Sequence, residues 1–199
     1  MTGSESQRRA YLAAMGVDLW LPRGEDAADE APVEIGEGWE PLREAVVACT
    51  RCELAKSRSQ TVFGVGNPRA DWLLIGEAPG AEEDRLGEPF VGRAGKLLDE
   101  MLKAAGQARE QVFIANILKC RPPGNRDPKP DEAASCREYL ERQIELIQPR
   151  IILAVGRIAA QNLLGSDAPV GRLRGRVHDL DGIPLVVTYH PAYLLRSPS

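Results

Sequence analysis

Short apolar runs alternate with amphipathic segments from about residue 41 onward, and this alternation constrains the fold more than any other feature of the chain. The apolar runs, which we predict as strands, cover residues 72–75, 112–116, 151–155 and 184–188. The segments with helical periodicity cover residues 41–49, 94–105, 131–147 and 157–164. Alternating strands and helices are typical of a parallel sheet with helices on both faces. The sequence therefore predicts an α/β fold.

The first 40 residues differ in composition, and we expect them to lie outside the folded domain of residues 41–199. They hold 3 basic and 9 acidic residues, whereas the rest of the chain holds 22 basic and 20 acidic residues. Residues 7–21 have the periodicity of a short amphipathic helix, and residues 22–38 are rich in Pro, Gly, Asp and Glu, as linkers are. Either this segment is a solvated tether or its helix docks a protein partner.

Composition narrows the class of protein further. Hydrophobic residues make up 43% of the chain, enough for a core, but no run of about 18 apolar residues is present to span a membrane. The N-terminus lacks the apolar segment of a secretory signal, so we expect a cytoplasmic protein. We also expect a monomer. The net charge of −4 argues against a nucleic-acid partner, whereas two local basic clusters argue for one. These clusters are Lys119, Arg121, Arg126 and Lys129, and then Arg172, Arg174 and Arg176.

The chain has four cysteines. Cys49 and Cys52 form a Cys-x2-Cys pair, and Cys120 and Cys136 follow far downstream. Thiols stay reduced in the cytoplasm, so four cysteines there favour a metal site over disulfides. A zinc ribbon usually has two close pairs, and scattered cysteines without histidine suit a [4Fe–4S] cluster at least as well as zinc. Spacing alone leaves a cluster, zinc and unrelated buried thiols as alternatives.

Polar residues stand at the ends of the predicted strands. Glu77 follows the first strand, Asn116 ends the second, and His190 follows the last. Ligands of open parallel sheets bind beyond the carboxyl ends of the strands, so we expect these three side chains to meet at one crevice. The acidic residues 82–84 disfavour a phosphate beside Glu77 and favour a neutral ligand or a water molecule that needs a base.

The residue types at this crevice each allow a structural or a functional interpretation. A buried Asn must be hydrogen-bonded, and Asn116 either caps a turn or reads the edge of a pyrimidine. Phe90 is either a core residue or a stacking platform. His190 is either structural or, beside the other polar residues, catalytic. Leu194 and Leu195 either pack as a helical turn or wedge a DNA duplex open.

In combination, these motifs resemble those of the family 4 uracil-DNA glycosylases, the iron–sulfur type. The matching pieces lie in order within residues 41–196 and are Cys49-x2-Cys52, Gly76-Glu-Ala-Pro-Gly80 with Glu82-Glu-Asp84, Pro89-Phe-Val-Gly-Arg-Ala-Gly95, Asn116-Ile-Leu-Lys-Cys-Arg-Pro-Pro-Gly-Asn125, Cys136 and His190-Pro-Ala-Tyr-Leu-Leu-Arg196. The resemblance implies a three-layer α/β/α fold with a central, mostly parallel four-stranded sheet. It also implies a [4Fe–4S] cluster on the four cysteines and a monofunctional glycosylase. That enzyme would hydrolyse the N-glycosidic bond of uracil in DNA and so start base excision repair.

The same resemblance implies how uracil-containing DNA would be held. Phe90 would stack on the flipped uracil, Asn116 would pair with its N3–H and O4 edge, and the backbone near Ala78 would bind O2. We expect the cluster to be structural and to brace basic residues against the DNA backbone. The residues expected to contact DNA are Lys119, Arg121, Arg126, Arg174, Arg176, Leu194, Leu195 and Arg196.

Catalytic roles follow from the resemblance as well. His190 would stabilise the negative charge that develops on the departing uracil. Glu77 would position or polarise the attacking water, with Glu83 and Asn125 as supporting or rival candidates. These types suit the reaction, because a carboxylate favours an oxocarbenium-like sugar and hydrogen-bond donors favour an anionic base.

Two further features bear on activity. Family members usually continue with another helix after the histidine motif, so we expect that final helix to be truncated or absent at Ser199. A sister group that bonds covalently to uracil-DNA carries a Lys-Arg-Arg-Ile-His-like insert after the Asn strand, whereas residues 120–128 here hold no histidine. We therefore predict turnover. The alternatives are a module of the same fold that only recognises, or covalently links to, uracil-DNA, and a zinc-stabilised hydrolase of another substrate.

Overall fold

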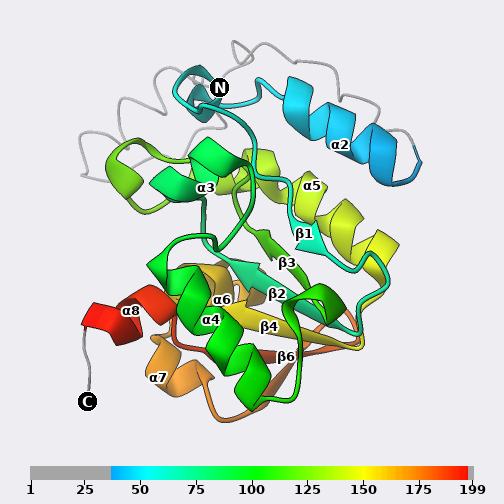
Figure 1. Ribbon diagram of the computed structural model, residues 1–199, viewed down its shortest axis with the longest axis vertical. Helices are drawn as coiled ribbons and strands as arrows, with labels where there is room; N and C mark the ends of the chain where they lie inside the picture. Colours follow the sequence, from blue (N-terminus) through cyan, green and yellow to red (C-terminus); the bar gives the residue numbers. More distant parts are fainter. Residues whose placement is uncertain (1–36, 197–199) are drawn as a thin grey trace, which may run out of the picture. The chain divides into compact units, whose positions relative to one another are not determined.

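Six strands form one mixed, mostly parallel sheet within residues 37–196, the part of the chain that the computed structural model describes (Figure 1). The strands are β1 (Val65–Gly66), β2 (Trp72–Gly76), β3 (Phe113–Asn116), β4 (Ile151–Val155), β5 (Val177–Leu180) and β6 (Ile183–Thr188). Their order across the sheet is β1-β3-β2-β4-β6-β5. The four central strands run parallel, and β1 and β5 pair antiparallel at the two edges.

The four predicted strands are the four parallel ones, and the α/β fold class is confirmed. The two edge strands are additional to the four-stranded sheet that the sequence predicts. β1 is only two residues long, and β5 alternates between exposed and partly exposed residues. Neither has the continuous apolar run that marks a strand buried on both faces, so the sequence carries little signal for them.

Seven α-helices and three short 3₁₀ helices accompany the sheet in the described residues. The α-helices are α2 (Trp39–Ala48), α3 (Ala81–Leu86), α4 (Arg93–Ala104), α5 (Pro130–Ile147), α6 (Arg157–Leu164), α7 (Val170–Leu173) and α8 (Pro191–Arg196). The 3₁₀ helices are Glu53–Lys56, Arg109–Gln111 and Pro123–Asn125. The four predicted helices are confirmed, with their ends shifted by at most two residues. None of these helices is long and apolar enough to cross a membrane.

The predicted helix of residues 7–21 lies outside the described residues, and so do residues 22–36 of the predicted linker.

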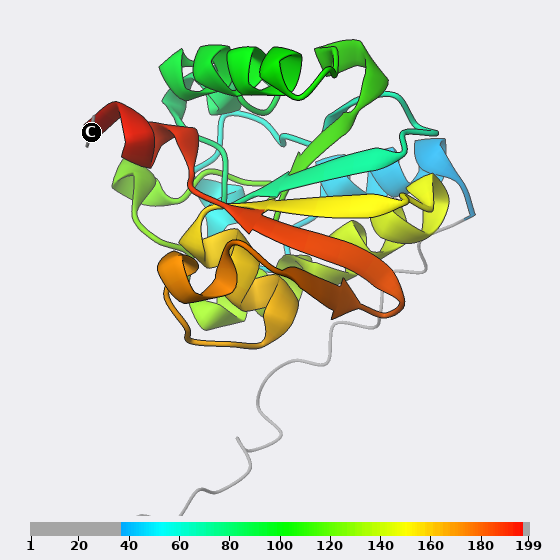
Figure 2. The same cartoon turned by 90° about the horizontal axis from the view of Figure 1, so that it is seen from below.

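Helices cover both faces of the sheet, which gives the three layers visible in Figure 2. Successive side chains of a strand point to opposite faces, so the adjacent β2 residues Leu73 and Leu74 belong to different layers. Leu74 packs with Leu98 of α4, whereas Leu73 belongs to the larger core with Leu42 of α2 and Tyr139 of α5. Burial of each such leucine stabilises the fold by about 1.5–3 kcal/mol.

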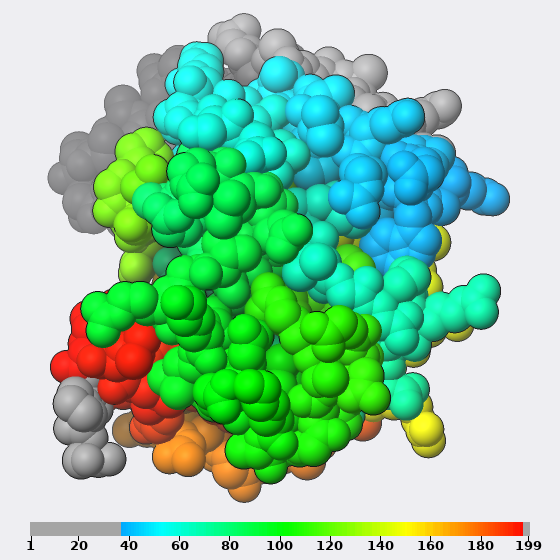
Figure 3. Space-filling view, in the orientation of Figure 1, coloured from blue at the N-terminus to red at the C-terminus, as the bar shows by residue number. Residues whose placement is uncertain are grey.

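The strand order places a crevice at the end of β2. The chain passes from β2 to β3 on one side of it and returns to β4 on the other, so β2 lies at the point where the winding reverses. Open α/β sheets bind ligands at such a point, beyond the carboxyl ends of their strands. The short helix α8 packs against α4 beside this edge, and Figure 3 shows the two helices (red and green) meeting at the surface.

Candidate active site

A cavity of about 640 Å³ lies at the carboxyl ends of the parallel strands. This is within the range of about 300–1,000 Å³ that is usual for small-molecule sites. The cavity brings together the side chains expected at the strand ends, Glu77, Asn116 and His190. Other predicted site residues that line it are Ala78, Glu83, Phe90, Asn125, Arg126 and Arg196.

The glycine at the end of β2 lets the base-reading candidates approach one another. A Cβ atom at Gly76 would lie 2.4 Å from Asn116 Oδ1 and 2.7 Å from Phe90 Cε2, so only glycine fits there. Gly76 and Asn116 are register partners in the sheet, which sets the amide beside the phenyl ring. Asn116 is 2% exposed, and it lines the cavity.

Phe90 is held in a strained backbone conformation. Its φ is 54°, in the left-handed region, which costs a non-glycine residue on the order of 1–3 kcal/mol. The Glu83 carboxylate supports this turn, because its Oε1 accepts hydrogen bonds from the backbone N–H groups of Val91 (3.0 Å) and Gly92 (3.1 Å). The structure thus gives Glu83 a contact that positions the Phe90 loop.

His190 is held as a neutral hydrogen-bond donor. The backbone N–H of Ala192 donates to Nδ1 at 3.1 Å, so the neutral imidazole carries its proton on Nε2. Burial lowers the pKa of His190, and the positive charge of Arg196 lowers it further. The ring stacks on Phe90, with centroids 5.5 Å apart and planes 26° apart. Gly156, where a Cβ atom would lie 2.9 Å from His190 Cβ, makes room for the turn.

Glu77 is a carboxyl group whose proton is held unusually tightly. Its burial and the nearby negative charge of Asp127 raise its pKa to about 7, against the opposing effect of Arg157 and Arg196. Arg157 and Asp127 form an ion pair of 2.6 Å at the wall of the same cavity. A carboxyl group with a pKa near neutrality in a cavity is well suited to position or polarise a water molecule.

The rival candidate Asn125 is exposed, and its Oδ1 accepts a hydrogen bond of 2.7 Å from Arg121 Nε. Arg126 is fixed by a two-point ion pair, since Nη1 and Nη2 contact the buried Glu132 carboxylate at 2.8 and 2.5 Å. These contacts order the loop between β3 and α5 along the cavity edge.

Lys119 does not lie where the sequence places it. It is 1% exposed, and its Nζ donates to the Asn116 carbonyl oxygen at 3.0 Å and to Gln143 Oε1 at 2.6 Å. A DNA phosphate cannot reach it, so the prediction that Lys119 contacts the DNA backbone is wrong. The sequence shows that Lys119 is charged, but it does not show which way the side chain points. That direction depends on the helix that packs over it, here α5.

The remaining predicted DNA-contact residues are at the surface. Those classed as exposed are Arg174, Arg176, Leu195 and Arg196, and those partly exposed are Arg121, Arg126 and Leu194. Four polar residues that line the cavity were not among the predicted site residues, namely Asp127, Arg157, Tyr189 and Tyr193. The signal for Arg157 was present, because it directly follows the end of a predicted parallel strand.

The four cysteines form a separate site. All are free thiols, and all line one pocket, while none lines the cavity of Glu77 and His190. Arg58 Nη1 donates to Cys120 Sγ at 3.1 Å, and the Lys119 backbone N–H donates to Cys136 Sγ at 3.3 Å. Burial raises the pKa of the Cys136 thiol to about 11, so a positively charged centre is needed to hold it as a thiolate.

The donor set fits an iron–sulfur centre. Four cysteines line one pocket, and an all-cysteine ligand set is typical of iron–sulfur clusters. N–H groups that donate to cysteine sulfur, as Arg58 and Lys119 do here, are usual around such clusters.

Fold and site together define a protein of the uracil-DNA glycosylase type. The family model "Uracil DNA glycosylase superfamily" matches residues 63–199. The type-4 uracil-DNA glycosylase of Archaeoglobus fulgidus is 44% identical over 81% of this chain and 85% of its own length. The type-4 enzyme of Thermotoga maritima is 45% identical over 80% and 84%. A type-5 enzyme of Thermus thermophilus is 35% identical over 53% and 55%. The chain therefore belongs to the type-4 uracil-DNA glycosylases, as its motifs predict.

Proposed function

We infer that this protein is a uracil-DNA glycosylase, which hydrolyses the bond between uracil and deoxyribose in DNA at the start of base excision repair. The observation that carries this function is the meeting of the Asn116 amide, the Phe90 ring and the neutral His190 imidazole in one cavity. Type-4 relatives that are 44% and 45% identical over about 80% of the chain support the same activity.

We propose that Asn116 selects uracil. Its amide accepts from N3–H and donates to O4 of uracil, while Phe90 supports the face of the base. Cytosine has an amino group in place of O4 and an unprotonated N3, so two donor–acceptor pairs become mismatched. Each unpaired buried polar group costs about 1–3 kcal/mol, which excludes the normal base. The strained turn at Phe90, held by Glu83, keeps the stacking ring in place.

We propose that His190 and Glu77 divide the chemistry between them. Bond cleavage leaves negative charge on the uracil and positive charge on the sugar. The Nε2–H of His190 donates to O2 of the leaving base, and a neutral imidazole does so without surrendering a proton. Glu77, which follows the end of β2, holds the attacking water and in its ionised form stabilises the sugar cation.

We further propose that Cys49, Cys52, Cys120 and Cys136 hold a [4Fe–4S] cluster. Such a cluster supplies a rigid crosslink, here between the turn after α2, the segment after β3, and α5. None of the four cysteines lines the cavity, which supports a structural role for the cluster. Iron and sulfide analysis, with an absorbance band near 400 nm that bleaches on reduction, tests the assignment, and stoichiometric zinc would overturn it.

The glycosylase activity has a direct test. The protein is incubated with an oligonucleotide that carries one uracil, and alkali then cleaves the strand at any abasic site. Matched strands with cytosine or thymine at that position are the controls. We expect cleavage of the uracil strand alone. Tight binding without an abasic product would support a recognition module instead, and an adduct that survives a denaturing gel would support covalent linkage.

A further inference from the structure

Lys119 is a buried cation without a carboxylate partner. Its side chain is almost wholly excluded from solvent, and it takes part in none of the ion pairs formed within residues 37–196. The two acceptors of its Nζ are neutral, namely the Asn116 carbonyl and the Gln143 side chain. An ammonium group buried among neutral partners is costly, and an apolar side chain of similar length would be cheaper to bury. We therefore expect a negative charge near Lys119 that stabilises its ammonium group.

The cysteine pocket supplies that charge when it is loaded. Lys119 lines this pocket, and its backbone N–H donates to Cys136 Sγ. Four thiolates carry more negative charge than the iron–sulfide core neutralises, so a loaded centre is anionic and attracts a nearby ammonium. Two arginines line this pocket as well: Arg58, which donates to Cys120 Sγ, and Arg51.

A short segment of the chain connects Lys119 to the active site. Residues 116–120 lead from the base-reading Asn116 to the cysteine ligand Cys120. Along the segment, the N–H groups of Ile117 and Leu118 donate to the carbonyl oxygens of Gly76 (2.9 Å) and Glu77 (3.1 Å). Lys119 Nζ then turns back to the Asn116 carbonyl. One segment thus contacts both the cysteine pocket and the backbone of the cavity.

Gln143 anchors the other side of the lysine. It is 0% exposed, and its Nε2 donates to the Phe63 carbonyl at 2.9 Å while its Oε1 accepts from Lys119. Because both amide atoms are used, the Lys119 side chain is fixed in one place.

We propose that Lys119 is a positioning residue that couples the cysteine centre to base recognition. Its ammonium balances the negative charge of the loaded centre, and its hydrogen bond holds the Asn116 backbone in the orientation that reads uracil. This inference rests on the proposed function, because it presupposes the roles given to Asn116 and the four cysteines.

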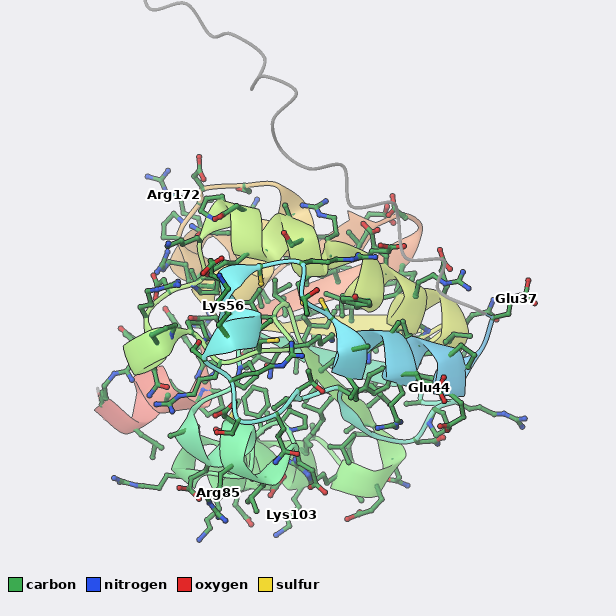
Figure 4. The ribbon with its side chains drawn as sticks, turned by 90° about the horizontal axis from the view of Figure 1, so that it is seen from above. Glu37, Glu44, Lys56, Arg85, Lys103 and Arg172 are labelled. Carbon is green, nitrogen blue, oxygen red and sulfur yellow. The ribbon has the colours of Figure 1, made fainter. Side chains whose placement is uncertain are left out.

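The test compares two lysine substitutions in the iron-loaded protein. Lys119→Met removes the buried charge and its donors at similar length. Lys103→Met is the matched control, since Lys103 is on α4 and points outward from the surface (Figure 4). The measurements are iron content, the midpoint potential of the bound cluster, and kcat and KM on a uracil-containing oligonucleotide.

For Lys119→Met we expect a lower midpoint potential, because a lost positive charge disfavours the added electron. We also expect kcat to fall by about 10–100-fold, the usual effect of removing a group that orients metal ligands. Lys119→Arg, which retains charge and donors, is expected to restore the potential and part of the rate. Lys103→Met should match the wild type. A folded, iron-loaded Lys119→Met protein with wild-type potential and rate would overturn the inference.

A second measurement needs no variant and decides the case if the substituted proteins do not fold. Amide hydrogen exchange is followed in the wild-type protein before and after removal of iron. We expect faster exchange at Ile117 and Leu118, relative to the fully buried β6 residue Leu185. Unchanged relative exchange would refute the coupling. If the wild-type protein released no uracil at all, the proposed function would fail, whereas the potential measurement would still test Lys119 and the exchange measurement would still test the coupling of residues 116–120 to the cysteine centre.

Discussion

The phenyl ring of Phe90 and the imidazole of His190 stack directly on one another, with their centroids 5.5 Å apart. A base inserted between them would need about 7 Å, twice the usual carbon–carbon contact distance of about 3.5 Å. In the proposed function, uracil stacked on this face of Phe90 would therefore lie beside His190, with the imidazole at the edge of the base and not at its face. This edge contact is the one that an Nε2–H donor requires.

Removal of the imidazole should slow uracil release with little effect on the fold. We expect His190→Ala to lower the single-turnover rate by about 10²–10³-fold, the usual loss for one donor to a developing anion. His178→Ala is the matched control, because His178 contacts the Leu173 carbonyl and does not line the cavity. Wild-type single-turnover rates in His190→Ala would refute the role of His190.

The ionisation of Glu77 should appear in the pH profile. Because the pKa of Glu77 in the free protein is about 7, we expect kcat/KM to rise with pH through about 7 as the carboxylate forms. Glu77→Gln should be slow and should lack this limb of the profile. The neighbouring Glu82→Gln, on the exposed face of α3, should keep it. If the rise in rate with pH is still present in Glu77→Gln, another group is responsible for the ionisation.

The contribution of Glu77 to the stability of the fold should decrease as the pH rises, whereas the rate should increase. The folded protein holds the Glu77 proton more tightly than the unfolded chain, whose pKa is near the ordinary 4.5. The stabilising contribution of this group is therefore complete below about pH 4.5 and is lost as the pH rises through about 7. We expect Glu77→Gln to have a higher Tm than the wild type at pH 8 and a similar Tm at pH 4. Thermal denaturation at the two pH values checks this, and equal Tm differences would contradict it.

Substitutions of Glu83 can show whether this residue positions the Phe90 loop or activates the attacking water. Its Oε1 accepts two backbone N–H groups of the Phe90 loop, and a glutamine oxygen can accept them too. We expect Glu83→Gln to retain most activity and Glu83→Ala to lose about tenfold or more in kcat/KM, because the loop loses two charge-assisted hydrogen bonds of about 1.5 kcal/mol or more each. Equally severe losses in both variants would instead indicate that Glu83 activates water.

Leu195 tests the predicted wedge. It is 42% exposed on α8, so truncation removes little of the core. We expect Leu195→Ala to leave Tm unchanged and to lower activity on double-stranded uracil-DNA more than on the single strand, which needs no opening. Equal activity losses on the two substrates would argue for a packing role.

The parallel strands and the main helices of the fold could be predicted from the local pattern of apolar and polar residues. The run Trp72-Leu-Leu-Ile75 is apolar at every position because β2 is buried on both faces, and the helix at 157–164 follows from its periodicity. Because ligands of such sheets bind beyond the strand ends, Glu77, Asn116 and His190 could be predicted to share one cavity. The structure confirms that they do. The two-residue strand β1 left no comparable signal, because its pairing depends on β3, about 50 residues downstream.

The sequence by itself determined the parallel sheet, the identity of the polar groups at its edge and the family to which the chain belongs. Only the tertiary structure decided what those groups contact. Lys119 has the same charge as its basic neighbours, yet Gln143 and Asn116 enclose it, and the proton of His190 is placed by the N–H of Ala192. Residue type is a local property, whereas burial, hydrogen-bond partners and pKa are set by the segments that pack around a side chain.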